Sequence, residues 1–218
     1  MLNGRAVQVV RTGVANTASV LAALRRAGGA PELTLDKEII ASAPLLVLPG
    51  VGAFGAAVAI IDSFGLRDIL IRRIREGQAT LCICLGLQLL FEASEESPDR
   101  RGLGIIPGSI VRFPRGVRVP QLGWNVVRPE SHSSYIRPGH AYFANSYCAR
   151  EVPAPWRVSY SEYYGRFAAA CELGSVLACQ FHPELSGPWG LEILRRWIER
   201  STDSAEQAQT HTSEGIPC

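Results

Sequence analysis

The sequence has little net charge and no cluster of basic residues. Its 218 residues include 22 Lys and Arg and 20 Asp and Glu, which gives a formal net charge of +2 at pH 7. The arginines are scattered among acidic residues, and Lys37 is the only lysine. Proteins that bind nucleic acid present a concentrated basic surface, so no nucleic-acid partner is expected.

The sequence also lacks the cysteine and histidine spacings of a metal site. None of its six cysteines forms a C-x-x-C pair or a Cys/His pattern typical of zinc, so we expect no metal. Most of the cysteines lie in apolar runs typical of β-strands, and no signal peptide precedes the first predicted strand. Both features are typical of a cytoplasmic protein with reduced thiols.

No long hydrophobic run is uninterrupted. Residues 39–61 lack charge and are long enough to span a membrane. Prolines and glycines interrupt them, which favours a buried strand, a glycine turn and the start of a helix, so no membrane segment is expected. At the other end, residues 201–218 contain few apolar side chains and are predicted to form a disordered polar tail.

The remaining residues, 1–200, are predicted to form a single α/β domain, because this length allows one substantial core. In the first half, predicted strands alternate with predicted helices, the strands at 6–10, 31–35, 45–48 and 80–83 and the helices at 18–27, 54–76 and 85–93. The helical pattern over 54–76 contains a predicted break near Gly65. This alternation predicts three layers, with a mostly parallel central sheet between helices. Beyond Gly102, short strands separated by Pro and Gly predict antiparallel hairpins, followed by a helix over 188–200.

One cysteine lies at a predicted strand-to-helix turn. Cys84 follows the β-prone run 80–83, and Gly86 stands at the start of the next helical pattern. Such a turn pushes the side chain out of the sheet, and a glycine lets the backbone fold closely beneath the sulfur. Taken alone, a cysteine in an apolar stretch is more often a small residue of the core. A nucleophile also needs a base, because a free thiol is mostly protonated at neutral pH.

The sequence His182-Pro183-Glu184 supplies a candidate base. In extended backbone, residues two apart lie on the same face of a strand, so Glu184 can hold the imidazole while its other nitrogen serves Cys84. Pro183 disfavours helix and supports the extended conformation. No carboxylate stands two residues after the other histidines, which are predicted to lie at the surface: His132, His140 and His211.

Four segments, in the expected order, resemble one protein family. Cys-Leu-Gly-Leu-Gln at 84–88 and Phe-His-Pro-Glu at 181–184 resemble the class I (triad) glutamine amidotransferases, which hydrolyse the glutamine side-chain amide and pass ammonia to a synthase. Pro-Gln-Leu-Gly-Trp-Asn at 120–125 and Tyr-Phe-Ala-Asn-Ser-Tyr at 142–147 resemble the glutaminase subunits of imidazole glycerol phosphate synthases, in histidine biosynthesis. The resemblance covers residues 6–200 and implies a flavodoxin-like, three-layer fold.

The resemblance implies a role for each matching residue. Cys84, His182 and Glu184 would form the catalytic triad, which needs no cofactor. The glycine turn after the strand at 45–48 would supply backbone amides for the oxyanion, and its peptide between residues 50 and 51 would reorient to complete the hole. The expected oxyanion residues are Gly50, Val51, Gly52 and Leu85.

The glutamine pocket would contain Gln88, one helical turn from the cysteine, and Asn145, Ser146 and Tyr147. Two residues depart from the family pattern. Asn145 stands where a histidine is usual, and Cys82 replaces a glycine two residues before the nucleophile.

The resemblance also implies a partner, because ammonia released into water would become ammonium. That partner is a (βα)8-barrel cyclase, joined in a heterodimer, which uses the ammonia to make imidazole glycerol phosphate and aminoimidazole carboxamide ribotide. Asn16, Trp124 and Tyr142 match family positions at the docking face. Leu185 occupies a position where a basic residue is frequent, so a salt bridge to the partner is expected to be absent.

Two alternatives remain open from the sequence. The chain fits another triad amidotransferase, such as one serving pyridoxal phosphate, nucleotide or anthranilate synthesis, although the segments at 120–125 and 142–147 argue against it. It also fits a catalytically silent binding subunit of the same fold. Intact Cys84, His182 and Glu184 oppose that reading, and Asn145 supports it.

Overall fold

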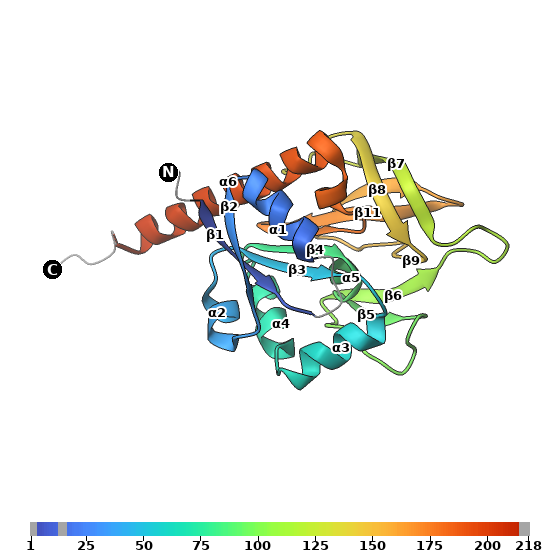
Figure 1. Cartoon of the computed structure of the whole chain (residues 1–218), viewed down its shortest axis with the longest axis horizontal. Coiled ribbons are helices and arrows are strands. Elements are labelled where there is room, and N and C mark those ends of the chain that lie inside the picture. Colours follow the sequence, from blue (N-terminus) through green and yellow to red (C-terminus); the bar gives the residue numbers. More distant parts are fainter. Residues whose placement is uncertain (1–3, 13–16, 214–218) are drawn as a thin grey trace.

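A nine-stranded sheet organises the protein (Figure 1). The computed structural model describes residues 4–12 and 17–213, with side chains described as far as Ser201. From one edge to the other, the strands are β2 (Gly29–Thr34), β1 (Arg5–Val10), β3 (Leu46–Gly50), β4 (Thr80–Cys84), β12 (Val176–Cys179), β11 (Arg166–Leu173), β10 (Arg157–Glu162), β7 (Gln121–Pro129) and β8 (Gly139–Asn145). A small second sheet contains β5 (Phe91–Ser94), β6 (Ile106–Arg112) and β9 (Tyr147–Cys148).

One half of the large sheet is parallel and the other half is antiparallel. Strands β2, β1, β3, β4 and β12 pair in parallel. Strands β12, β11, β10, β7 and β8 pair antiparallel. Every residue of β3, β4 and β12 is buried, as expected for parallel strands that are covered on both faces. The predicted α/β class is confirmed, with a parallel sheet in the first half and antiparallel hairpins later.

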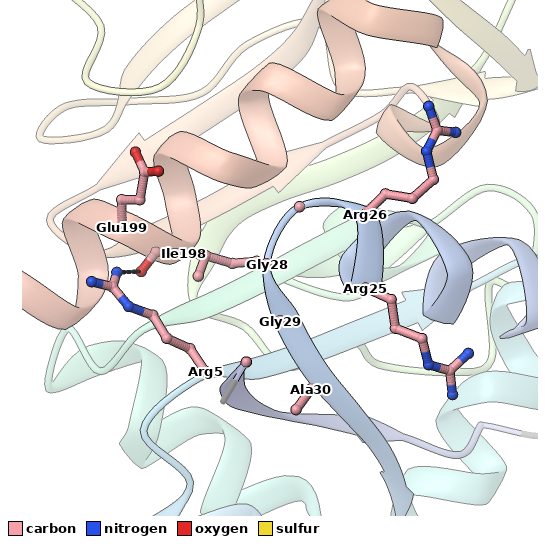
Figure 2. Close-up of a pocket in the computed structure, with 10 residues that line it drawn as sticks. Arg5, Arg25, Arg26, Gly28, Gly29, Ala30, Ile198 and Glu199 are labelled. Carbon is pink, nitrogen blue, oxygen red and sulfur yellow. Dashed lines mark hydrogen bonds between the residues drawn. The ribbon is translucent and has the colours of Figure 1, made fainter. Parts of the chain in front are cut away.

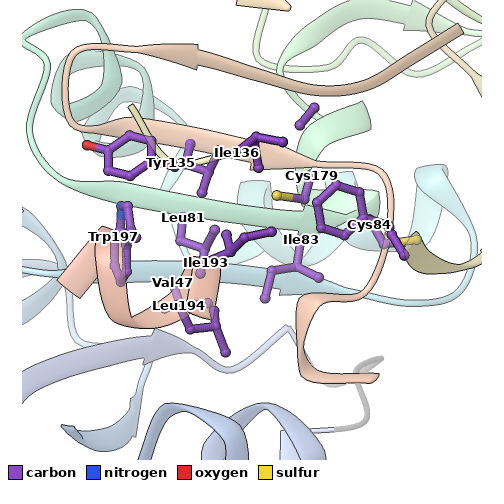
Figure 3. Packing of buried hydrophobic residues seen from close by; sticks show 14 of the residues in the cluster. Val47, Leu81, Ile83, Cys84, Tyr135, Ile136, Cys179, Ile193, Leu194 and Trp197 are labelled. Carbon is purple, nitrogen blue, oxygen red and sulfur yellow. The ribbon is translucent and has the colours of Figure 1, made fainter. Parts of the chain in front are cut away.

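Helices cover both faces of the parallel strands (Figure 1). On one face lie α1 (Thr17–Arg26) and α6 (Gly187–Ser213), and on the other α2 (Lys37–Ser42), α3 (Phe54–Ser63) and α4 (Arg67–Arg75). Figure 3 shows the first of these two cores, where Ile193 and Trp197 of α6 lie among Leu81 and other side chains of the sheet. Cys84 lies at the end of this cluster, so packing fixes the strand that presents it. Among the described residues, no helix combines the length and the apolar character needed to cross a membrane.

Three helices test the predicted boundaries. The pattern predicted over 54–76 divides into α3 and α4 at Gly65, where φ is +59°, as expected. The helix predicted over 85–93 is wrong beyond Gln88, because α5 (Leu85–Gln88) is followed by a two-residue turn and then by β5. The carbonyl of Leu90 accepts hydrogen bonds from the backbone N–H groups of Ile105 and Ile106, so tertiary pairing replaces the helical bonds there.

The last helix is longer than predicted. The sequence predicts an end near residue 200, whereas the backbone of α6 is helical to Ser213. Residues 201–213 contain no proline or glycine that would stop a helix. The division into one domain over 1–200 and a polar tail over 201–218 stays a prediction.

A buried arginine joins three segments beneath the parallel sheet. Arg73 of α4 is 2% exposed, and its guanidinium donates hydrogen bonds to the carbonyl oxygens of Ile40 (3.1 Å), Ala43 (2.6 Å) and Ala79 (3.0 Å). It also donates to the side-chain oxygen of Gln78 at 3.0 Å. Burial lowers the pKa of Arg73 to about 10, so the side chain is still charged at neutral pH. This one residue satisfies acceptors at the end of α2 and at the start of β4.

We expect Arg73→Met to lower the free energy of unfolding by about 2–4 kcal/mol, because the substitution leaves buried carbonyl groups without a donor. Urea denaturation measures this change. The control is Arg72→Met, whose side chain is exposed on the same helix and which should change stability by less than about 0.5 kcal/mol. Equal losses in the two variants would contradict the role given to the buried guanidinium.

Candidate active site

Cys84 ends β4 in a strained backbone conformation. Its φ is 53° and its ψ is −104°, and positive φ is rare for residues other than glycine. Two glycines make room for the turn. A Cβ on Gly86 would lie 2.2 Å from the carbonyl oxygen of Leu48, and one on Gly50 would lie 2.7 Å from the Cβ of Leu85. Helix α5 begins at Leu85, so the predicted strand-to-helix turn is present around the sulfur.

His182 and Glu184 form a hydrogen-bonded pair next to this turn. Strand β12 pairs in parallel with β4, with Cys179 opposite Ile83, so the chain leaves β12 beside Cys84. The Nδ1 atom of His182 lies 2.8 Å from Oε1 of Glu184, and the two side chains are 5% and 4% exposed. The exposed histidines His132 and His140 take no part, and the side chain of His211 lies outside the described residues.

The conformation that joins the pair differs from the one predicted. His182 itself is extended, with φ −99° and ψ 97°, but Pro183–Leu185 forms a 3-10 turn instead of continuing the strand. Ser186 holds this turn in place: its hydroxyl donates to the carbonyl of His182 at 2.6 Å and accepts from the backbone N–H of Tyr142 at 3.0 Å. A turn stabilised from β8 therefore aligns the imidazole and the carboxylate.

The surroundings of His182 favour its protonated form. Burial lowers the pKa of His182, but hydrogen bonds to Cys84 and Glu184 and the negative charges of both groups raise it, to a net value of about 10. The imidazole is therefore protonated at neutral pH, with its Nδ1–H donated to the carboxylate. Such a group can pass the proton on its other nitrogen to a leaving group.

A cavity of about 240 Å³ joins these groups to most of the other predicted site residues. Its lining includes Val51, Gly52, Cys84, Leu85, Gln88, Asn145, Ser146, Tyr147 and His182. Gly50 does not line it and lies beneath, paired with Cys84 in the register of β3 and β4. The tertiary structure thus brings together segments from β3, α5, β8 and the chain after β12.

A single backbone carbonyl fixes the amide side chains in this cavity. The carbonyl oxygen of Tyr147 accepts from Nδ2 of Asn145 at 2.9 Å and from Nε2 of Gln88 at 3.3 Å. Asn145 is 4% exposed, and its Oδ1 has no hydrogen-bond partner among the described residues. Since Nδ2 is held by Tyr147, Oδ1 is the acceptor of this side chain that is left without a partner.

Sequence reasoning missed two polar residues of the site. Glu96 lines the cavity, and its Oε2 accepts from the backbone N–H of Phe54 at 2.7 Å. Its position could not be predicted, because the sequence placed a helix where β5 leads into this loop. Gln180 is completely buried, and its Nε2 lies 3.6 Å from Sγ of Cys84. The sequence does contain one indication of the position of Gln180: it stands two residues before His182, and residues two apart in extended backbone lie on the same face.

The predicted docking residues lie on one face of the β7–β8 hairpin. Trp124 is opposite Tyr142 in the strand register, and their rings make an edge-to-face contact at 6.2 Å. We define the outer hairpin face as Leu122, Trp124, Tyr142 and Ala144, which share one side of the hairpin in the strand register. On β8 they alternate with buried residues, and on β7 with residues less exposed than themselves. Leu122 is 65% exposed and Trp124 is 58% exposed. Asn16, the third predicted docking residue, lies outside the described residues.

A larger cavity, of about 770 Å³, lies away from this chemistry (Figure 2). It is found where β1 and β2 begin and α1 ends, whereas Cys84 lies at the carboxyl end of β4. Arg5 in its wall donates to the carbonyl of Ile198 at 3.0 Å. Figure 2 shows that Arg25 and Arg26 point in different directions, so the basic groups do not converge on one ligand position. The smaller cavity, with its convergent polar groups, is the candidate site.

Comparison with known proteins finds a matching family model and similar chains. The family model for class-I glutamine amidotransferases matches residues 13–200. The chain is 40% identical over 196 residues to the imidazole glycerol phosphate synthase subunit HisH of Methanothermobacter thermautotrophicus, a match that covers 88% of this chain and 98% of that protein. It is 38% identical over 201 residues to the chloroplastic imidazole glycerol phosphate synthase hisHF of Arabidopsis thaliana, covering 88% of this chain and 34% of the plant protein. In fold, it is similar to a crystal structure of a glutamine amidotransferase, with a TM-score of 0.73, 22% identity, and coverage of 90% of this chain and 98% of that one.

The pKa of His182 gives a test of the pair. Glu184→Gln keeps the shape of the side chain and removes its charge, so it should lower the pH at which His182 loses its proton by about one unit or more. NMR titration of labelled histidine measures the midpoint directly. Glu192→Gln, at an exposed position of α6, is the control and should leave the midpoint unchanged. An unchanged midpoint in Glu184→Gln would show that the carboxylate does not set the charge of the imidazole.

Proposed function

This chain belongs to the class-I glutamine amidotransferase family, and from this premise we propose that it hydrolyses L-glutamine to L-glutamate and ammonia. The observation that supports the proposal most directly is the hydrogen-bonded pair of His182 and Glu184 beside Cys84 in one cavity. A thiol, an imidazole and a carboxylate in this order supply the nucleophile, the acid–base group and its orienting partner that covalent acyl transfer uses. The reaction needs no cofactor.

The proposed reaction forms and breaks a thioester. The thiolate of Cys84 attacks the side-chain carbonyl carbon of glutamine, and the carbonyl oxygen becomes an oxyanion. Protonated His182 then donates its proton to the amide nitrogen, so that ammonia leaves and a glutamyl thioester remains. Water, activated by the now neutral imidazole, attacks the thioester and releases glutamate. Glu184 stabilises the imidazolium in both halves of the cycle.

The turn after β3 is proposed to bind the oxyanion. The backbone amides of Val51, Gly52 and Leu85 lie in segments that line the cavity beside the sulfur. Gly50 has no side chain to prevent close packing of this turn on Leu85. In sites of this kind, one such donor contributes roughly a hundred- to a thousand-fold in rate. We keep reorientation of the peptide between Gly50 and Val51 as a hypothesis, which Gly50→Pro with full glutaminase activity would contradict.

The polar groups of the cavity suit the two ends of an amino acid. Glu96 supplies a carboxylate for the α-ammonium group, and Oδ1 of Asn145 supplies a neutral acceptor. Ser146 and Tyr147 bring the backbone of the β8–β9 connection to the same wall, and Gln88 holds that backbone in place. Asn145 therefore keeps an acceptor at the position where the family usually has histidine, without a second titratable ring.

We further propose that the ammonia passes to a (βα)8-barrel cyclase bound in a heterodimer, which makes imidazole glycerol phosphate and aminoimidazole carboxamide ribotide in histidine biosynthesis. Relatives of nearly the same length are named as subunits of imidazole glycerol phosphate synthase. The plant relative, hisHF, has the matching segment as only 34% of its length, so its chain carries a further region. A partner also solves the chemical problem that free ammonia is protonated in water at neutral pH.

The outer hairpin face is the proposed docking surface. Ala144 of this face also lines the cavity, so a protein that covers Leu122 and Trp124 also covers the cavity's edge. Leu185, 39% exposed, follows the catalytic carboxylate in the chain. An apolar contact is therefore expected at the position where relatives in the family often have a basic residue.

A cytoplasmic location remains our expectation. The five cysteines that the structure describes are all free and buried, which fits a reducing compartment.

The assignment of the nucleophile predicts a selective loss. Cys84→Ala should abolish glutamate release and glutamine-dependent synthesis by the complex, while synthesis from added ammonium salts continues. The control is Cys82→Ala, which changes a fully buried thiol two residues earlier and should retain glutamine use. Glutamine use by Cys84→Ala would contradict the assignment of the nucleophile. If the wild type and both variants all lack glutaminase activity, even with a liganded cyclase, the chain is a catalytically silent subunit.

The docking surface predicts a loss of affinity. Trp124→Ala should raise the dissociation constant for the cyclase by about ten- to a hundred-fold, because a large aromatic ring in an interface core contributes about 2 kcal/mol or more. Isothermal titration calorimetry measures the change. Tyr164→Ala removes an aromatic ring of similar exposure (63%) from the β10–β11 turn and should have no effect. If only the Tyr164 variant binds more weakly, the partner docks elsewhere.

A further inference from the structure

Gln180 connects the glutamine pocket to the sulfur through a chain of buried amides. Its Nε2 lies 3.6 Å from Sγ of Cys84, and its Oε1 accepts from Nε2 of Gln88 at 3.1 Å. Gln88 in turn donates to the carbonyl oxygen of Tyr147 at 3.3 Å. Gln180 is completely buried and Gln88 is 5% exposed, so water does not compete along this chain.

The direction of these hydrogen bonds is fixed by chemistry at one end. The carbonyl of Tyr147 can only accept, so the group of Gln88 that faces it must be the NH2. That same NH2 faces Gln180, which must therefore present its oxygen to Gln88. The NH2 of Gln180 is then the group that remains for the sulfur. A flipped Gln180 would place two oxygens or two donors against each other, which is unfavourable in a buried site.

We propose that Gln180 is a catalytic residue that donates an N–H to the thiolate of Cys84. The inference rests on the proposed role of Cys84 as the nucleophile. His182 also contacts the sulfur, but its proton is transferred during the reaction. The amide of Gln180 keeps its protons at every step, so it stabilises the negative sulfur without competing as an acid. Because its other end is held by Gln88, the donor is also oriented by the residue that lines the substrate pocket.

Several other ionisable groups lie near Cys84. His182 lies beside it with Glu184 behind, and Glu96 lines the same cavity. The thiol of Cys179, on β12, lies in the same core as Cys84, whereas Cys82 lies in the core on the other face of the sheet. Burial raises the pKa of both thiols. All of these groups stay in place when only the amide of Gln180 is changed, so a change in titration can be assigned to that amide.

The test is the pH dependence of alkylation of Cys84 by iodoacetamide in the full-length protein, followed by mass spectrometry. Gln180→Met keeps an unbranched side chain of similar length and removes the donor. It should move the pH of half-maximal alkylation upward by about one unit, with the wild-type rate recovered within about two-fold at higher pH. Gln180→Glu replaces the donor by a carboxylate and should raise the pH of half-maximal alkylation at least as far. Gln121→Met changes another buried amide, 4% exposed on β7, and should leave the profile unchanged.

A merely structural role gives different results. If Gln180 only fills space, Gln180→Met and Gln180→Glu will both titrate like the wild type. That result overturns the inference. Alkylation requires neither glutamine nor a cyclase, so this outcome is separate from the proposed function. If the wild type hydrolyses glutamine and the alkylation midpoint of Gln180→Met is unshifted, only the role of Gln180 is rejected. If that midpoint is shifted and the wild type, even with a liganded cyclase, does not hydrolyse glutamine, only the proposed function is rejected.

Discussion

The parallel pairing of β12 with β4 is the contact on which the site depends. The register places Cys179 opposite Ile83, so Cys84 and the chain that leads to His182 leave the sheet side by side although they are almost a hundred residues apart. Helix packing holds both strands, with side chains of α6 on one face and of α3 and α4 on the other. A thiol and an imidazole can form a reactive pair only at a fixed separation, and the buried sheet provides that rigidity.

Strain at the cysteine is the second constraint, and the surrounding structure accommodates it. Positive φ at Cys84 is unfavourable for any residue with a side chain. The turn persists because its neighbours are fixed: Gly86 packs against the carbonyl of Leu48, and Gly50 packs against Leu85. The same close packing brings the turn after β3 next to the sulfur. One local arrangement therefore positions both the proposed nucleophile and the proposed oxyanion donors.

The polar groups of the site depend on one another because they are buried. The carbonyl of Tyr147 orients Asn145 and Gln88, Gln88 orients Gln180, and Ser186 ties the turn after His182 to β8. In a site with little water, a correctly paired donor and acceptor make the structure more rigid. A buried polar group without a partner lowers the stability of the folded state. Strand β8 takes part in both the polar network and the outer hairpin face. This shared strand gives a physical connection between the proposed docking surface and the proposed glutamine pocket.

The sequence by itself determined the α/β class, the turn at Cys84, the candidate residues Cys84, His182 and Glu184, and the segments around the pocket. These depend on local requirements: apolar periodicity, glycine where the backbone is crowded, and side chains with suitable chemistry. Only the tertiary structure decided that a 3-10 turn aligns Glu184 with His182, that β5 replaces the second half of a predicted helix, and that Glu96 and Gln180 belong to the site. Each of these follows from hydrogen bonds between residues distant in sequence, and the order of residues along the chain does not specify which distant groups will meet.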